Sequence, residues 1–401
     1  MKTAVRDVMT SRVVCVKKDA PYKEMAARLR ENRISAFPVL DDEGKVIGVV
    51  SEADLLTKEA LDGGYEGMPG MITGLLRRKE QGKARGITAA DLMTHPAVTI
   101  SPDAAVEDAA RLMHKGKINR LPVVDSDGHL TGIISRADVL SVLDHSDPEI
   151  RSEITADVIL DEFLSYSPPE GMTAMKATAM KTSVEEIMTT QVVAVKLGAS
   201  FKEMAAALRG NRVSAFPVID DDGKVIGVVS EADMLARKVL NADHAGTFTA
   251  VPHRREQDNA DGLTARDLMT HPAITVTPDD SVEQAARLMY TLQVKRLPVI
   301  DHRGALVGII SRADVLAVYD RPDEEIREEI IGDVIVDGFG QDPEVFTVSV
   351  QAGVVTLEGS PQSVTLGHDL VRKVRHVQGV VAVRDRLSYP GTYPVVAGPV
   401  W

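Results

Sequence analysis

A short pattern with a serine and an aspartate three residues apart occurs four times in this chain of 401 residues. In each copy a glycine and two β-branched residues precede the serine, which predicts a strand that runs directly into a helix. The hydroxyl and the carboxylate then lie together at the first helical turn, where backbone amides favour an anion. The four copies are Gly48–Asp54, Gly132–Asp138, Gly227–Asp233 and Gly308–Asp314.

Helix capping alone explains part of this pattern. In a capping box, a serine hydroxyl and an acidic side chain three residues later satisfy free backbone amides at the start of a helix. Capping does not require the preceding glycine and β-branched residues, however, and glutamate would serve as well as aspartate. From the residues alone, a helix cap and a ligand-binding site both stay open as interpretations.

The residues around each copy predict the same order of elements, namely strand, helix, strand, strand, helix. In the first repeat we expect strands at 13–16, 36–40 and 45–50, because these runs are rich in β-branched and apolar residues. Helical spacing of apolar residues predicts a helix at 21–31, and a second helix begins after Ser51. A glycine closes the turn between the last two strands, where a positive φ is expected.

The chain contains an internal duplication. Residues 5–56 match residues 184–235 at more than two positions in three, and residues 88–140 match 264–316 almost as closely. Two copies of a paired unit therefore make up most of the chain.

These repeats resemble the CBS domain, whose members occur in tandem pairs called Bateman modules. The resemblance covers about 2–143 and 182–319, and it rests on the closing aspartates and on a proline in the second strand of each unit. It implies an α/β (α+β) fold with four CBS repeats arranged as two Bateman modules. The expected bounds of the repeats are 1–60, 85–145, 182–240 and 262–321.

The end of the chain predicts a different, smaller unit with the order αββαβ. We expect an acidic amphipathic helix at 322–336, strands at 345–350 and 354–357, a helix near 363–377 and a last strand at 380–387.

This last unit resembles a BON domain, which its family associates with osmotic stress and phospholipid binding. The Gly353–Gly359 and Gly379–Val383 segments match the pattern of that family. The expected bounds of the BON domain are 322–390. In the first half of the chain, residues 146–181 keep only a remnant BON helix and a linker.

In the CBS family, adenosine nucleotides and related ligands lie in clefts between the two repeats of a pair. The resemblance implies that the motif aspartate accepts hydrogen bonds from ribose hydroxyls and that the serine lies near phosphate. It also implies that the strand leading to the proline meets the adenine edge. The residues so implied are Ser51, Asp54, Ser135, Asp138, Ser230, Asp233, Ser311 and Asp314 at the helix starts, with Phe37, Pro38, Leu121, Pro122, Phe216, Pro217, Leu297 and Pro298 on the strands.

The residue after the motif serine differs between the two units of each pair. It is Glu52 or Glu231 in the first unit, and Arg136 or Arg312 in the second. Arginine beside a phosphate is favourable, whereas glutamate repels it. We hypothesise that the second-unit sites prefer phosphorylated ligands and that the first-unit sites prefer uncharged adenosine-like ligands or stay empty. The alternative is that all four side chains point to solvent.

Composition narrows the classes of function. A formal net charge of −13 argues against general nucleic-acid binding and against electrostatic docking on anionic membranes. The first residues lack the apolar core of a secretory signal, and no stretch approaches the roughly 18 apolar residues of a membrane span. The single cysteine, Cys15, fits a reducing compartment, so a cytoplasmic location is expected.

The sequence contains no P-loop, Cys-x-x-Cys, His-Glu-x-x-His or Gly-x-Ser-x-Gly motif. We therefore expect a non-enzymatic regulatory or sensor protein that binds AMP, ADP, ATP or S-adenosylmethionine, needs no metal, and signals to a protein partner. The repeats could form an intramolecular disc or a homodimer, and the BON unit could contact lipid. The alternative is a ligand-free CBS and BON interaction scaffold in stress response.

Overall fold

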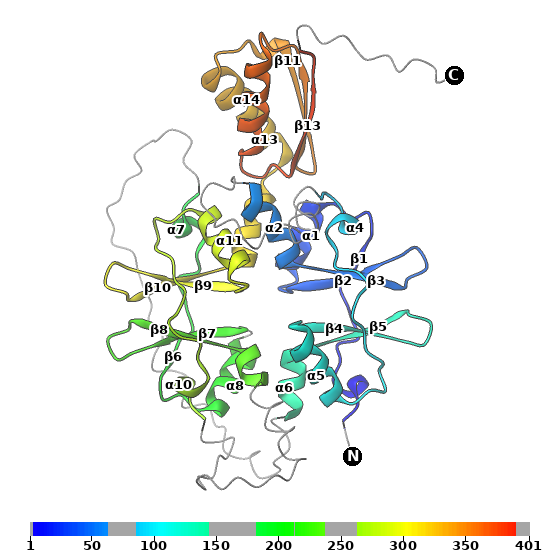
Figure 1. The fold of residues 1–401 in the computed structure, drawn as a ribbon, viewed down its shortest axis with the longest axis vertical. Helices are drawn as coiled ribbons and strands as arrows, with labels where there is room; N and C mark the ends of the chain where they lie inside the picture. The colour runs from blue at the N-terminus through cyan, green and yellow to red at the C-terminus, as the bar shows by residue number, and fades with distance from the viewer. Residues whose placement is uncertain (1–2, 63–85, 144–181, 212, 237–262, 390–401) are drawn as a thin grey trace, which may run out of the picture. The chain divides into compact units, whose positions relative to one another are not determined.

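We describe the fold from a computed structural model of the chain. The chain divides into two compact units, and Figure 1 shows the helices and strands of both, coloured by residue number. Unit 1 comprises Met1–Cys15, Ala36–Val49 and Thr94–Arg312, and unit 2 comprises Val16–Ser35, Val50–Met93 and Ala313–Trp401. The residues that the structure describes are 3–62, 86–143, 182–211, 213–236 and 263–389.

Each repeat contains the helices and the strand hairpin that the sequence predicts. In the first repeat the elements are η1 (Val5–Asp7), β1 (Val16–Lys17), α1 (Tyr22–Glu31), β2 (Ala36–Leu40), β3 (Val46–Ser51) and α2 (Glu52–Asp62). In the second repeat they are α4 (Ala89–Leu92), α5 (Val106–Gly116), β4 (Arg120–Val124), β5 (Leu130–Ser135) and α6 (Arg136–Leu143).

The third and fourth repeats follow the same order. In the third repeat the elements are α7 (Val184–Ile187), β6 (Val195–Lys196), α8 (Phe201–Asn211), β7 (Ala215–Ile219), β8 (Val225–Ser230) and a helix at 231–236. In the fourth they are α10 (Ala265–Leu268), α11 (Val282–Thr291), β9 (Arg296–Ile300), β10 (Leu306–Ser311) and α12 (Arg312–Leu316).

The first strand is shorter than predicted. The run at 13–16 predicts four residues of strand, but β1 contains only Val16 and Lys17. In the third repeat the equivalent β6 pairs with β7 in parallel through two residues. The prediction is wrong in extent because β-branched residues favour an extended backbone, whereas a strand also needs a partner within hydrogen-bonding distance.

The hairpin of each repeat sets the position of the motif serine. In the third repeat β7 and β8 are antiparallel, with Phe216 opposite Val229 and Ala215 opposite Ser230. The same register places Ser135 opposite Arg120, and Ser311 opposite Arg296. The predicted turn glycines have positive φ, namely Gly44 (84°), Gly128 (88°), Gly223 (77°) and Gly304 (84°).

One hydrophobic cluster in unit 1 contains residues of both the second and the third repeats. Val139 in α6 and Met234 in the helix at 231–236 are both fully buried members of it. The start of each of these helices is therefore held by a packed core. Within the described residues, no helix has both the length and the apolar character that a membrane crossing requires.

The C-terminal part of unit 2 has the predicted αββαβ order (Figure 1). Strand β12 pairs antiparallel with β11 and parallel with β13. The predicted helix at 322–336 is one α-helix followed by a π-helical segment. The elements are η4 (Ala317–Asp320), α13 (Asp323–Glu329), η5 (Ile330–Gly338), η6 (Pro343–Val345), β11 (Phe346–Gln351), β12 (Val354–Gly359), α14 (Val364–Arg375) and β13 (Ala382–Leu387). The remnant helix and linker expected at 146–181 lie outside the described residues.

Candidate ligand-binding site

The motif serine and aspartate are joined by the same two hydrogen bonds in three repeats. In the third repeat the Ser230 backbone amide donates to Asp233 Oδ2 at 2.8 Å, and the Ser230 hydroxyl donates to the same oxygen at 2.6 Å. This arrangement caps the helix that follows β8. The same pair of bonds links Ser135 to Asp138 (2.7 and 2.7 Å) and Ser51 to Asp54 (2.9 and 2.6 Å).

Two of these aspartates keep a second carboxylate oxygen that the cap does not use. The capping residues Glu186 and Glu203 also use a single oxygen, but they are exposed, whereas Asp138 and Asp233 are half-buried. Among the described residues, Oδ1 of Asp138 and Oδ1 of Asp233 accept no hydrogen bond. Asp280, which caps a turn in the fourth repeat, differs because its Oδ2 accepts from Thr277 and its Oδ1 accepts from Gln284 at 2.9 Å. Asp138 and Asp233 therefore each keep an acceptor at a helix N-terminus.

The remaining residues of the predicted site lie at the end of β10, at the start of α12 and within the second strand of each repeat. Ser311 ends β10 and Asp314 lies in the first turn of α12, and both are half-buried. The predicted site residues on the strands are buried, so their side chains belong to the core. The buried strand residues are Phe37, Pro38, Leu121, Pro122, Phe216, Pro217, Leu297 and Pro298.

The two motif arginines are buried. Arg136 has an exposed fraction of 9% and Arg312 one of 7%. The alternative that these side chains point to solvent is therefore wrong for both arginines. Arg312 donates to the backbone oxygen of Met289 at 3.3 Å.

The charge of Arg136 interacts with two carboxylates of the third repeat. Burial lowers the pKa of Arg136, and the negative charges of Glu231 and Asp233 oppose that shift. Its Nε has no hydrogen-bond partner among the described residues. From the sequence, Arg136 was expected to act at the Asp138 site. The interaction of the Arg136 charge with Asp233 was not expected. The reason is tertiary, because α6 and the helix at 231–236 pack in one hydrophobic cluster.

Glu231 lies within the field of four basic side chains. Burial raises the pKa of Glu231, and the cations Lys295, Arg120, Arg136 and Arg296 lower it without cancelling the effect of burial. Three of these cations, Arg120, Lys295 and Arg296, lie on the strands that the family resemblance assigns to adenine, but no role was predicted for their side chains. The signal available was an Arg-Leu-Pro sequence at the start of the second strand, which begins at Arg120 and at Arg296.

Arg296 and Arg120 reach from one repeat of a pair to the other. The Arg296 guanidinium donates to the Ser214 hydroxyl at 2.9 Å and to the Ala215 backbone oxygen at 3.4 Å. Arg120 makes the equivalent bond to the Ala36 backbone oxygen at 3.4 Å. Both arginines thus bind the start of the strand that the family resemblance assigns to adenine.

We expect Glu231→Gln to raise the melting temperature at neutral pH. Since the pKa of Glu231 is raised on folding, the folded chain binds this proton more tightly than the unfolded chain does, and stability falls as pH rises through the folded pKa. The glutamine variant lacks this loss. Thermal unfolding from pH 5 to pH 8 should show a variant advantage that grows with pH. Glu185→Gln, at an exposed position, is the control. If Glu231→Gln proves less stable than the natural chain at pH 8, the expectation is contradicted.

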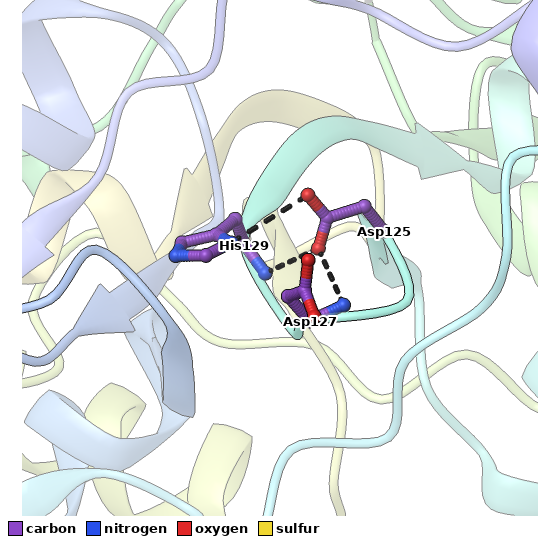
Figure 2. Close-up of side chains that lie close together, drawn as sticks. All are labelled: Asp125, Asp127 and His129. Atoms are coloured by element: carbon purple, nitrogen blue, oxygen red, sulfur yellow. Dashed lines mark hydrogen bonds and ion pairs between the residues drawn. The ribbon is translucent and has the colours of Figure 1, made fainter.

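Three potential metal ligands lie together in the β4–β5 turn. Figure 2 shows Asp125, Asp127 and His129, whose ligand atoms all lie within 4.8 Å of one another. Asp125 Oδ1 accepts from the backbone amides of Asp127 (3.0 Å) and His129 (2.9 Å), and these bonds lower the pKa of Asp125. The equivalent aspartate makes the same two backbone bonds in the other three repeats, where Lys45, Lys224 and Ala305 stand in place of the histidine. Turn formation therefore explains why Asp125 is there.

Comparison with known proteins identifies the repeats. A family model described as CBS domain matches residues 5–60, 89–145, 184–239 and 265–321, together more than half of the chain. CBS domain-containing protein CBSX1, chloroplastic, of Arabidopsis thaliana is 37% identical over 133 residues, which are 31% of this chain and 56% of that protein. Uncharacterized protein MJ1404 of Methanocaldococcus jannaschii is 25% identical over 315 residues, which are 78% of this chain and 61% of that protein. The chain thus spans less than two thirds of both relatives.

A solved structure of CBSX2 in complex with AMP is also similar. It is 32% identical with a TM-score of 0.32, and the match covers 35% of this chain and 97% of CBSX2.

Proposed function

We propose, because this chain belongs to the CBS domain family, that its repeats bind an adenosine-type nucleotide and that it is a regulatory sensor rather than an enzyme. The observation that carries the proposal is the unused acceptor on the motif aspartates. Asp233 and Asp138 cap their helices with Oδ2, while Oδ1 accepts no hydrogen bond from the described residues. A ribose hydroxyl is a donor of the kind that such an oxygen can bind.

The charges around the third-repeat site support a phosphorylated ligand. A phosphate near Ser230 would meet the N-terminus of the helix at 231–236, where the helix dipole favours an anion. Arg136 adds a buried positive charge that interacts with the charge of Asp233. The negative charge of Glu231 would repel a phosphate, but the positive charges of four basic side chains act on Glu231. We therefore propose that the third-repeat site takes AMP, ADP or ATP, with S-adenosylmethionine as a cationic competitor. This proposal replaces, for the third repeat, the hypothesis that a first-unit site prefers an uncharged ligand or stays empty, because the charge of Arg136 also acts on Asp233.

The C-terminal unit is proposed to be a BON domain that contacts a protein partner or lipid. Its αββαβ order and the left-handed Gly353 and Gly379, with φ of 75° and 89°, support this assignment. A sensor without a catalytic site needs such a contact surface to transmit ligand binding.

A thermal-shift experiment tests the proposed function. We expect AMP at 100 times its dissociation constant to stabilise the folded chain by about 2.7 kcal/mol. AMP is the first probe because the CBSX2 structure contains it. Adenosine, ADP, ATP and S-adenosylmethionine complete the series, and GTP is the control for purine specificity. The proposal fails if none of the adenine ligands raises the melting temperature above that with GTP.

A ligand-free interaction scaffold is the second candidate function. The observation that favours it is that Arg136 already compensates Glu231 and Asp233 within the protein. In that case these charges stabilise the packing of two repeats and no nucleotide is required. Equal melting temperatures with and without every adenine ligand would favour the scaffold, and the search would turn to protein partners.

A further inference from the structure

A lysine in the first repeat holds the start of the C-terminal unit. Lys23 lies in α1, and its Nζ donates to Asp323 Oδ1 at 2.7 Å and to the Arg321 backbone oxygen at 2.7 Å. The side chains of Lys23 and Asp323 are only 15% and 33% exposed. A second ion pair joins Arg30 of the same helix to Asp320. Two basic residues of one helix therefore bind the segment that leads into α13, and all of these residues belong to unit 2.

Asp323 also binds the turn between β11 and β12. Its Oδ2 accepts from the Ala352 amide at 2.6 Å, and its Oδ1 accepts from the Gly353 amide at 2.9 Å. Burial opposes the charge of this carboxylate, but the bonds from Lys23 and the two amides outweigh burial and hold the pKa of Asp323 below its usual value. One carboxylate thus ties the first repeat to the sheet of the C-terminal unit.

Helix α1 also contacts the first turns of α2 in the first repeat. Tyr22, the neighbour of Lys23, is buried, and its hydroxyl donates to the Leu55 backbone oxygen at 2.9 Å. Leu55 directly follows Asp54, the aspartate of the candidate site. The Tyr22 ring also packs edge-on against Tyr319, with ring centroids 4.7 Å apart. Tyr22 therefore touches both the first turns of α2 and the chain just before the C-terminal unit.

The duplicated third repeat provides an internal comparison. Tyr22-Lys23-Glu-Met becomes Phe201-Lys202-Glu-Met, so the lysine is kept and the tyrosine hydroxyl is missing. Lys202 makes no ion pair with any described residue. The tyrosine hydroxyl is therefore present in the first repeat, whose helix α1 binds the C-terminal unit through Lys23.

We propose that Lys23 and Asp323 form a latch that docks the C-terminal unit on α1, and that closure of this latch is coupled to ligand binding at Ser51 and Asp54. The coupling runs from Asp54 through the Leu55 carbonyl to Tyr22, and from Lys23 to Asp323 and the β11–β12 turn. A ligand that orders the start of α2 favours the latched state, and by linkage the latch raises affinity for that ligand. The coupled ligand is the nucleotide of the proposed function, on which this part of the inference rests.

Amide hydrogen exchange at Ala352 and Gly353, measured by NMR on the full chain without ligand, tests the latch. We expect Lys23→Met to speed exchange of both amides about tenfold, since their acceptor loses its cation. Tyr22→Phe, which removes only the hydroxyl, should give a smaller increase and so test the link to α2. The matched control Lys202→Met should leave both rates unchanged. Unchanged rates in the Lys23 variant, or an equal increase in the Lys202 variant, would overturn the latch. Unchanged rates in the Tyr22 variant would overturn the coupling route.

Adding AMP tests the coupling. In the natural chain AMP should slow exchange of the two amides by about fivefold, and Lys23→Met should weaken AMP binding that depends on Asp54 by the same factor. If AMP binds but neither effect occurs, the coupling is wrong. If AMP does not bind, the proposed nucleotide function is wrong, and so is the coupling of the latch to a nucleotide. The exchange rates measured without ligand still decide whether the latch exists.

Discussion

Asp233→Ala is expected to weaken AMP binding at the third repeat by about 1.5–3 kcal/mol, or roughly 10- to 150-fold. The substitution removes Oδ1, the oxygen that accepts no hydrogen bond from the described residues and that we assign to a ribose hydroxyl. It also removes one of the two negative charges that act on Arg136. Isothermal titration would show the change as one fewer tight site, because each of the other repeats keeps its own aspartate.

The same substitution removes a helix cap, so affinity and stability must be measured separately. Loss of the cap is expected to lower stability by about 0.5–1 kcal/mol. Asp280→Ala is the matched control, since Asp280 accepts the Thr277 amide and hydroxyl in the same way but has its second oxygen bonded to Gln284. Both variants should lose stability, and only Asp233→Ala should lose affinity. A stability loss in Asp233→Ala with unchanged AMP affinity would show that the aspartate is a cap and nothing more.

The order of elements could be predicted because the duplication presents each local pattern several times. Strand β2 has the predicted bounds, 36–40, since an apolar run ends there at an Asp-rich turn. The start of α2 follows Ser51 as the capping pattern requires. The extent of β1 could not be predicted, because it depends on which residues reach a neighbouring strand.

The charged surroundings of the site depend on contacts that no local pattern encodes. Arg136 and Glu231 are 95 positions apart in the sequence, and they interact because two helices share a core. Lys23 and Lys202 are both followed by Glu-Met, yet Lys23 binds Asp323, 300 residues further along the chain. Repetition predicts what the repeats share, whereas these contacts depend on how the repeats and the C-terminal unit pack.

The glycine of the recurring motif has a packing explanation. A Cβ at Gly227 would lie 2.6 Å from Met269 Sδ and 3.1 Å from the Thr270 backbone oxygen. Gly308 meets Met188 and Thr189 in the same way. Each methionine comes from the other repeat of the pair. Helix capping does not require this glycine, as the sequence indicated. The close contact with the other repeat explains the glycine without a ligand.

Gly227→Ala is therefore expected to lower stability by about 1–3 kcal/mol, the range for overpacking a close contact. The Met269 side chain can move, but the Thr270 oxygen cannot move as easily, because Val228 and Thr270 exchange two backbone hydrogen bonds at 3.1 and 2.9 Å. The added methyl group must therefore strain or break a link between the third and fourth repeats. Chemical unfolding monitored by circular dichroism would measure the loss.

Gly210→Ala in the same repeat should have the opposite effect. Gly210 lies within α8, is exposed, and a Cβ there would meet nothing within 4 Å. Alanine loses less backbone entropy than glycine in a helix, so this variant should gain about 0.5–1 kcal/mol. Opposite signs for two substitutions of one type would show that the contact with Met269 and Thr270, and not the loss of glycine as such, sets the effect at Gly227. If Gly227→Ala is neutral, the methionine packing does not explain the glycine, and a role for it in ligand binding becomes the better account.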